Sequence, residues 1–267
     1  ELCTTDRYRE RSQDCRPSAK YYIYMDVVGL LMSTLESTRC NLLRHWFSGK
    51  RNSSYDIITA LIYGTWIQSA INKPLLIKHP STPSGMYYIN PQGLCSSPLV
   101  QVYCDMTSKN GFGVTVIGHD SGSRTLVKGY ESPGSYKRKI KYGIFMEQIV
   151  AIVKQSKNCE QFIKYECYGS GLWFSTQCGW WVSRQGSKMN YWGGAAVNSG
   201  KCACGMTNSC AGGRKCNCDR NDRTWREDSG YLTDKNTLPV TELRFGDTGT
   251  TSAGEKGYHT LGKLRCW

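Results

Sequence analysis

The feature that most constrains this chain is a cysteine-rich segment in its C-terminal half. Five cysteines fall within 17 residues there, at Cys202, Cys204, Cys210, Cys216 and Cys218. Two tryptophan motifs precede it, W-W-V from Trp180 and Y-W-G-G from Tyr191. The segment is rich in Gly, Cys and Asn and has no single hydrophobic period, which excludes a long helix or a regular strand. Its shape must therefore be fixed by disulfides or by a metal ion.

The cysteine content and spacing favour disulfides over zinc. The chain holds fourteen cysteines, and oxidising compartments favour disulfide-linked scaffolds. Structural zinc sites prefer about two to four residues between cysteines, whereas the C-x-C spacing is atypical. The chain begins at Glu1 rather than Met, as expected after removal of a signal peptide, although a truncation boundary would look the same. We therefore expect a secreted, extracellular protein.

Charge and hydropathy narrow the class of partner. We find no run of ~18 uncharged apolar residues, so the sequence predicts no transmembrane segment. The net charge of +13 has two readings, solubility or the attraction of an acidic partner such as an acidic glycan or an acidic protein. An extracellular setting argues against nucleic acid.

The first 78 residues predict a helical hairpin or coiled extension. Apolar residues from Tyr24 to Trp46 recur in steps of three and four, which is typical of an amphipathic helix, and a second helix is expected from Ser53. Such helices must cover another surface or pair with other chains, so a homo-oligomer or larger extracellular assembly is expected. Asn52, in the loop between them, begins the only N-x-[ST] sequon and is a predicted glycosylation site.

A Pro/Ser-rich hinge at Ser81–Ser84 separates this extension, residues 1–78, from a second domain, residues 79–267. The expected fold class is α+β and rich in disulfides. A helix is predicted over 145–153, and strands are predicted over 85–90, 99–106, 113–118, around 159–167, 238–245 and 261–266.

The second domain resembles the fibrinogen-like domain of contactin-associated proteins, which belong to the neurexin superfamily of cell-adhesion receptors. The motifs that carry the resemblance are, in order, G-M-Y-Y-I-N-P-Q-G, V-Y-C-D-M-T, C-E-Q-F-I-K-Y-E-C, W-W-V, Y-W-G-G, K-C-A-C-G, K-C-N-C-D and L-G-K-L-R-C. The resemblance covers about residues 79 to 266. It implies a fibrinogen-like fold, a recognition function and a disulfide between Cys159 and Cys167. Residues 1–78 show no such resemblance.

Two departures from that family concern cysteines. The cysteine that would pair with Cys104 is missing near His79, so Cys95 or an N-terminal cysteine is expected to serve it; Cys95 and Cys178 stand where the family pattern has none. Cys266 is expected to pin the C-terminus. Residues 1–78 carry three cysteines and the rest carries eleven. If all are oxidised within one chain, a disulfide must join the two parts; otherwise a free thiol remains or chains are cross-linked.

The candidate sites are a calcium loop and a group of aromatic residues. Closely spaced oxygen ligands can bind calcium, the one cofactor considered, and the candidates are Asp219, Asn221, Asp222 and Asp228. Three arginines interleave with these acids, so a salt-bridged surface loop explains the same residues. Trp173, Trp180 and Tyr191 could stack against sugar rings, but such residues are equally typical of a core, which we expect for Trp181 and Trp192.

No G-x-S-x-G, H-E-x-x-H, GxGxxG or P-loop pattern occurs, so we expect no enzyme. The expected function is non-catalytic recognition or adhesion through a protein or glycan ligand. Two alternatives stay open: a structural oligomer assembled through the N-terminal helices, and a calcium-dependent defence lectin.

Overall fold

The computed structural model describes residues 83–92, 98–109, 112–173, 176–250, 252 and 254–267. The strands in these residues are β1 (Gly85–Ile89), β2 (Val100–Asp105), β3 (Val114–Ile117), β4 (Thr125–Val127), β5 (Tyr136–Lys139), β6 (Cys159–Tyr168), β7 (Trp180–Val182), β8 (Arg226–Leu232), β9 (Glu242–Phe245) and β10 (Lys256–Cys266). The helices are α3 (Met146–Gln155) and α4 (Ala203–Met206), with 3-10 turns η1 (Ala211–Gly213) and η2 (Cys218–Arg220). None of these helices is long and apolar enough to cross a bilayer.

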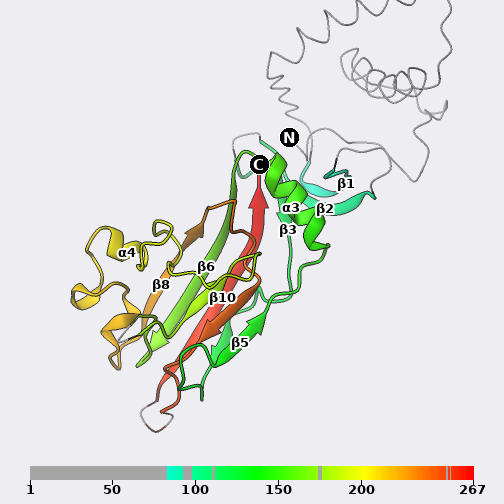
Figure 1. Cartoon of the computed structure of the whole chain (residues 1–267). Helices are drawn as coiled ribbons and strands as arrows, with labels where there is room; N and C mark the ends of the chain where they lie inside the picture. The colour runs from blue at the N-terminus through cyan, green and yellow to red at the C-terminus, as the bar shows by residue number, and fades with distance from the viewer. Residues whose placement is uncertain (1–82, 93–97, 110–111, 174–175, 251, 253) are drawn as a thin grey trace, which may run out of the picture. The chain divides into compact units, whose positions relative to one another are not determined.

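Two antiparallel sheets organise the strands. The larger has the order β1-β2-β3-β10-β6-β8, with β4 also paired to β10, and the smaller has the order β5-β9-β7. The two long strands β6 and β10 lie at the centre of the larger sheet (Figure 1). Buried and half-exposed residues alternate along the whole of β6, so one face of this strand meets the core and the other meets solvent.

The core lies between the inner faces of the two sheets. Tyr165 of β6 stacks on Phe245 of β9 with ring centroids 4.4 Å apart, and Phe245 also stacks on His259 of β10. Trp181 and Trp192 are completely buried, which confirms their predicted place in the core. Each donates its indole N–H to a main-chain carbonyl, so the polar end of each ring is satisfied.

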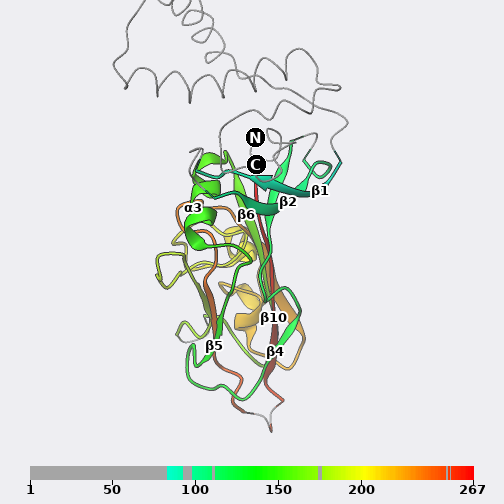
Figure 2. The same cartoon turned by 90° about the vertical axis from the view of Figure 1, so that its right-hand side faces the viewer.

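The predicted α+β class is wrong, because the described residues are mostly β-sheet. Of their helices only α3 exceeds a single turn; it confirms the helix predicted over 145–153 and buries Ile149, Ile152 and Val153. Figure 2 shows α3 beside the end of the sheet formed by β1 and β2. The strands β4, β5, β7 and β8 have no counterpart among the predicted ones, and residues 238–240 are not a strand. The predicted helical hairpin and Asn52 lie outside the described residues.

Four disulfides join described cysteines, in the pairs Cys159–Cys266, Cys167–Cys218, Cys202–Cys216 and Cys204–Cys210. The predicted pair Cys159–Cys167 is therefore wrong. Both residues stand on β6, where eight residues of extended strand separate their Cα atoms by ~26 Å. A disulfide needs Cα atoms within about 7 Å. Cys104 is also disulfide-bonded, with a partner outside the described residues. The expected partner Cys95 is not among the described residues.

Candidate recognition surface

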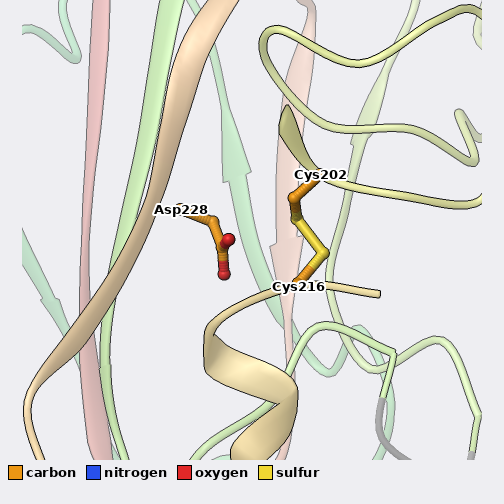
Figure 3. A group of neighbouring side chains, drawn as sticks. All are labelled: Cys202, Cys216 and Asp228. Atoms are coloured by element: carbon orange, nitrogen blue, oxygen red, sulfur yellow. A yellow bond between two sulfur atoms is a disulfide. The ribbon is translucent and has the colours of Figure 1, made fainter. Parts of the chain in front are cut away.

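The cysteine-rich segment is a disulfide knot, as predicted. Two of its disulfides close the segment on itself, and Cys167–Cys218 ties it to β6. Figure 3 shows Asp228 of β8 beside the Cys202–Cys216 bond, with one potential ligand atom of each residue within 4.8 Å of the others. The thiolate is the form of cysteine that binds a metal. Because these two sulfur atoms are bonded to each other, neither is a thiolate.

Two buried aspartates hold the knot from inside. Main-chain N–H groups donate to Asp219 at 2.7–3.1 Å, and they belong to Leu172, Trp173 and Cys216. The two carboxylate oxygens of Asp228 each accept one main-chain N–H at 2.9 Å, from Asn217 and Cys218. Burial raises the pKa of Asp228 to about 6 and also raises the pKa of Asp219. The hydrogen bonds accepted by these two carboxylates therefore fix the conformation of the loop.

The other two calcium candidates lie at the surface of the knot. Asp222 makes a bidentate ion pair with Arg226, at 2.7 and 2.9 Å, which lowers the pKa of Asp222. Asn221 has a left-handed backbone and donates its side-chain amide to Asp247 at 3.3 Å. The four residues thus make separate contacts, and Asn221 makes its contact through the amide nitrogen. Calcium binding by them stays a prediction.

The aromatic candidates are placed differently from one another. Tyr191 is buried, and its ring packs edge-on against Trp181 with centroids 5.3 Å apart. Trp173 is half-buried. Trp180 is half-buried as well, and the Nζ of Lys188 lies 3.8 Å from its ring centroid. The structure does not bring the three together as one exposed platform, and their role in ligand binding stays a prediction.

A different aromatic cluster is exposed next to the knot. Trp225 is 47% exposed, and its ring centroid lies 5.5 Å from that of Tyr168 and 5.8 Å from that of Tyr258. The guanidinium carbon of Arg124 lies 3.3 Å from the Tyr258 ring centroid, and the Nζ of Lys256 is 5.6 Å from the Trp225 ring. We call these five residues the Trp225 surface.

The Trp225 surface borders an open pocket of about 540 Å³. The wall of this pocket carries positive and negative side chains. The pocket is lined by Arg124, Glu166, Asn217, Trp225, Arg226 and Glu227. Arg124 donates to Glu166 at 2.8 Å, and this contact lowers the pKa of Glu166. Asn217 belongs to the knot, Glu166 lies on β6, and Arg226 and Glu227 lie on β8. Trp225 directly precedes β8, and Arg124 directly precedes β4, which pairs with β10. The knot thereby fixes one wall of the pocket.

The sequence alone did not single out Trp225. It stands between charged residues in D-R-T-W-R-E-D, where no apolar period marks it. Tyr168 ends β6, Tyr258 is near the start of β10, and Trp225 directly precedes β8. The three rings therefore meet because β6 pairs with both β10 and β8. A lone tryptophan within a charged run was the one local signal.

Comparison with known proteins identifies relatives of this chain. The chain is 39% identical over 173 residues to neurexin-4 of Drosophila melanogaster, a match that covers 62% of this chain. It is 36% identical over 192 residues, 69% of this chain, to contactin-associated protein 1 of Rattus norvegicus, and 35% identical over 192 residues to the Mus musculus protein of the same name.

The match spans only 13% of each relative's own length. No protein-family model matches the chain. The predicted resemblance to contactin-associated proteins is thus confirmed at the level of sequence, while the fibrinogen-like assignment stays a prediction.

Proposed function

We propose that this chain is an extracellular recognition module of the adhesion type, which binds a protein ligand through the Trp225 surface. The similarity to neurexin-4 and to contactin-associated protein 1 supports the class of function. The disulfide knot supports the extracellular location, because such bonds persist in oxidising compartments. Residues 79–267 are proposed to form the recognition domain, and assembly through residues 1–78 is an additional proposal.

The observation that carries the proposal is an exposed tryptophan held on a rigid support. Trp225 directly precedes β8 and follows the knot, which three disulfides and two buried aspartates hold in place. Tryptophan, tyrosine and arginine dominate the binding energy of protein interfaces. A surface that is already fixed loses little conformational entropy when a partner binds. The mixed charges of the neighbouring pocket can then select the orientation of that partner.

The test uses contactin as the probe, since one relative is named for its association with it. We expect the purified full chain to bind immobilised contactin in surface plasmon resonance. The Trp225→Ala variant is expected to bind at least ~30-fold more weakly, because truncation of a central interface tryptophan costs about 2 kcal/mol or more.

Tyr231→Ala is the matched control. Tyr231 is 49% exposed on β8 and contacts Phe162 rather than the Trp225 surface. The Tyr231→Ala variant should bind contactin with an affinity within about 2-fold of the wild type, because Tyr231 lies outside the proposed interface. Equal binding by wild type and Trp225→Ala would show that this surface is not the site. Failure of the wild type to bind would remove contactin as the ligand.

A further inference from the structure

A second surface, on the small sheet, carries an array of cations. Along residues 136–142 exposed lysines alternate with half-buried residues. The exposed positions are Lys137, Lys139 and Lys141, and the apolar residues on the other side are Tyr136, Ile140, Tyr142 and Ile144. Because side chains alternate across an extended chain, the three lysines lie on one side of it. We call them the lysine strip.

Neighbouring strands add to this array. Lys137 of β5 is directly opposite Arg244 of β9, and Arg244 is opposite Trp180 of β7. Residues that are directly opposite in a sheet share a face. Lys188 lies over the Trp180 ring at 3.8 Å, and this cation–π contact holds its ammonium group on the same surface.

The positive charge of this surface is largely uncompensated. Arg138, on the core-facing side of β5, is paired with Asp120 at 3.3 Å, and Arg244 is paired with Glu242 at 3.0 Å. In contrast, the three lysines of the strip and Lys188 form no ion pair with any described residue. Two acidic residues lie near the strip. The main-chain N–H of Lys141 donates to Asp120, whose pKa is lowered by that hydrogen bond and by the nearby charges of Arg138 and Lys141, and Glu242, which pairs with Arg244, is directly opposite Lys139 in the sheet. The ammonium groups are therefore available to an external anion.

We propose that the lysine strip, together with Lys188, binds a sulfated polysaccharide of the glycosaminoglycan type. Successive strip lysines are spaced by ~6.7 Å along the strand, and adjacent strands are ~4.8 Å apart, so the cations form a regular open row. A linear chain with repeated sulfate groups can lie along such a row and contact several cations at once. The ammonium group of lysine is a compact point charge, which suits a sulfate that can approach from many directions.

A polysaccharide fits this surface better than a protein does. The cores of protein interfaces are depleted in lysine and depend on aromatic or aliphatic anchors. The exposed positions of the strip are all lysine. The site also differs from the Trp225 surface in its residues and strands, so a protein and a polysaccharide could bind separately.

The test compares two triple variants of the full chain with equal loss of charge. One removes the strip, K137Q/K139Q/K141Q, and the control removes three exposed lysines elsewhere, K154Q/K157Q/K263Q. Binding to a size-defined heparin oligosaccharide is measured by calorimetry at ~150 mM NaCl, where surface charges are already partly screened. We expect the strip variant to bind at least ~10-fold more weakly and the control within about 2-fold, because only local cations contact the ligand.

Two further single variants test which other residues contribute to heparin binding. Lys188→Gln, outside the strip, should weaken binding by about 3-fold, as expected for one peripheral charge. Trp225→Ala should bind heparin as the wild type does. Lysines on an edge strand also protect it from pairing with another chain, so each variant is first checked for an unchanged melting temperature and elution volume.

Three results would overturn the proposal. The wild type could fail to bind heparin, or both triple variants could lose affinity equally, which would indicate a general charge effect. Equal affinity of the wild type for fully desulfated heparin or for polyglutamate would show that the strip does not recognise sulfate groups.

Discussion

Asp228 is deeply buried and accepts two main-chain hydrogen bonds, and burial and hydrogen bonding act on its pKa in opposite directions. Burial dominates and raises the pKa to about 6 from an ordinary value of 3.8. The folded chain therefore takes up this proton at a higher pH than the unfolded chain does. It follows that the free energy of unfolding rises as the pH falls through 6, and that this gain is complete near 3.8.

The Asp228→Asn variant should lose this dependence on pH. We expect the wild type to gain about 1 kcal/mol of stability between pH 7 and pH 5 from this one group, and the variant not to gain it. Denaturant unfolding at the two pH values, followed by tryptophan fluorescence, measures the difference. Gly122→Ala, which changes no titratable group and places a Cβ where nothing lies within 4 Å, is the control and should keep the wild-type slope. An unchanged slope in Asp228→Asn would assign the proton uptake to another group.

At the scale of elements, the Y-W-G-G motif contacts β8 without any intervening side chain. A Cβ atom built on Gly230 would lie 2.6 Å from the main chain of Gly193, and one built on Gly193 would lie 2.4 Å from the carbonyl oxygen of Gly230. The N–H of Gly194 donates to the carbonyl of Tyr231 at 2.9 Å. The motif thereby fixes the strand that follows Trp225.

Substitution Gly230→Ala should separate these two segments. Because the clash is with main chain, it cannot be relieved by a change of rotamer, and we expect a loss of about 1–3 kcal/mol in the free energy of unfolding. Urea unfolding measures it. Gly122→Ala is the control, since a Cβ there would meet nothing within 4 Å and the backbone is not left-handed. Equal midpoints for the two variants would mean that Gly193 and Gly230 are farther apart than described.

The sequence predicts some of these elements and not others, for physical reasons. The strands β1, β2, β3 and β9 fall within predicted ranges because apolar residues mark them. In β5 the run Y-K-R-K hides its alternation, since Arg138 faces inward and is neutralised by Asp120. Disulfide pairing and the Trp225 surface depend on which strands become neighbours in the sheet. No local sequence pattern predicts which strands those are. The knot itself was predictable because its composition excludes regular structure.

At the scale of the whole molecule, the cysteine count has a consequence for assembly. Cys178 is a buried free thiol, and eight other described cysteines pair among themselves. Four cysteines lie outside the described residues, at positions 3, 15, 40 and 95, and one of them must bond Cys104. Three remain, and an odd number cannot be paired internally. At least one cysteine of residues 1–267 is therefore a second free thiol or joins another chain.

Thiol alkylation and gel electrophoresis distinguish these outcomes. Burial raises the pKa of Cys178 to about 11, so we expect it to react with iodoacetamide only after denaturation. The non-reduced protein should then show either a second labelled thiol, or a band of doubled mass that disappears on reduction. A monomer with no reactive thiol under denaturing conditions would contradict the free state of Cys178.

The disulfide at the end of β10 also determines how the molecule bears mechanical load. Cys266 is bonded to Cys159, its direct neighbour on β6, and the next residues, Trp267 and Asn158, exchange two main-chain hydrogen bonds of 2.9 Å. Without this disulfide, a pull on the chain at Trp267 would open the β6–β10 ladder one hydrogen bond at a time. With the disulfide at that end, tension between Trp267 and the chain before Cys159 passes from Cys266 through the two sulfur atoms to Cys159. Residues 160–265 lie inside the loop that this bond closes, so the β6–β10 ladder carries none of that load.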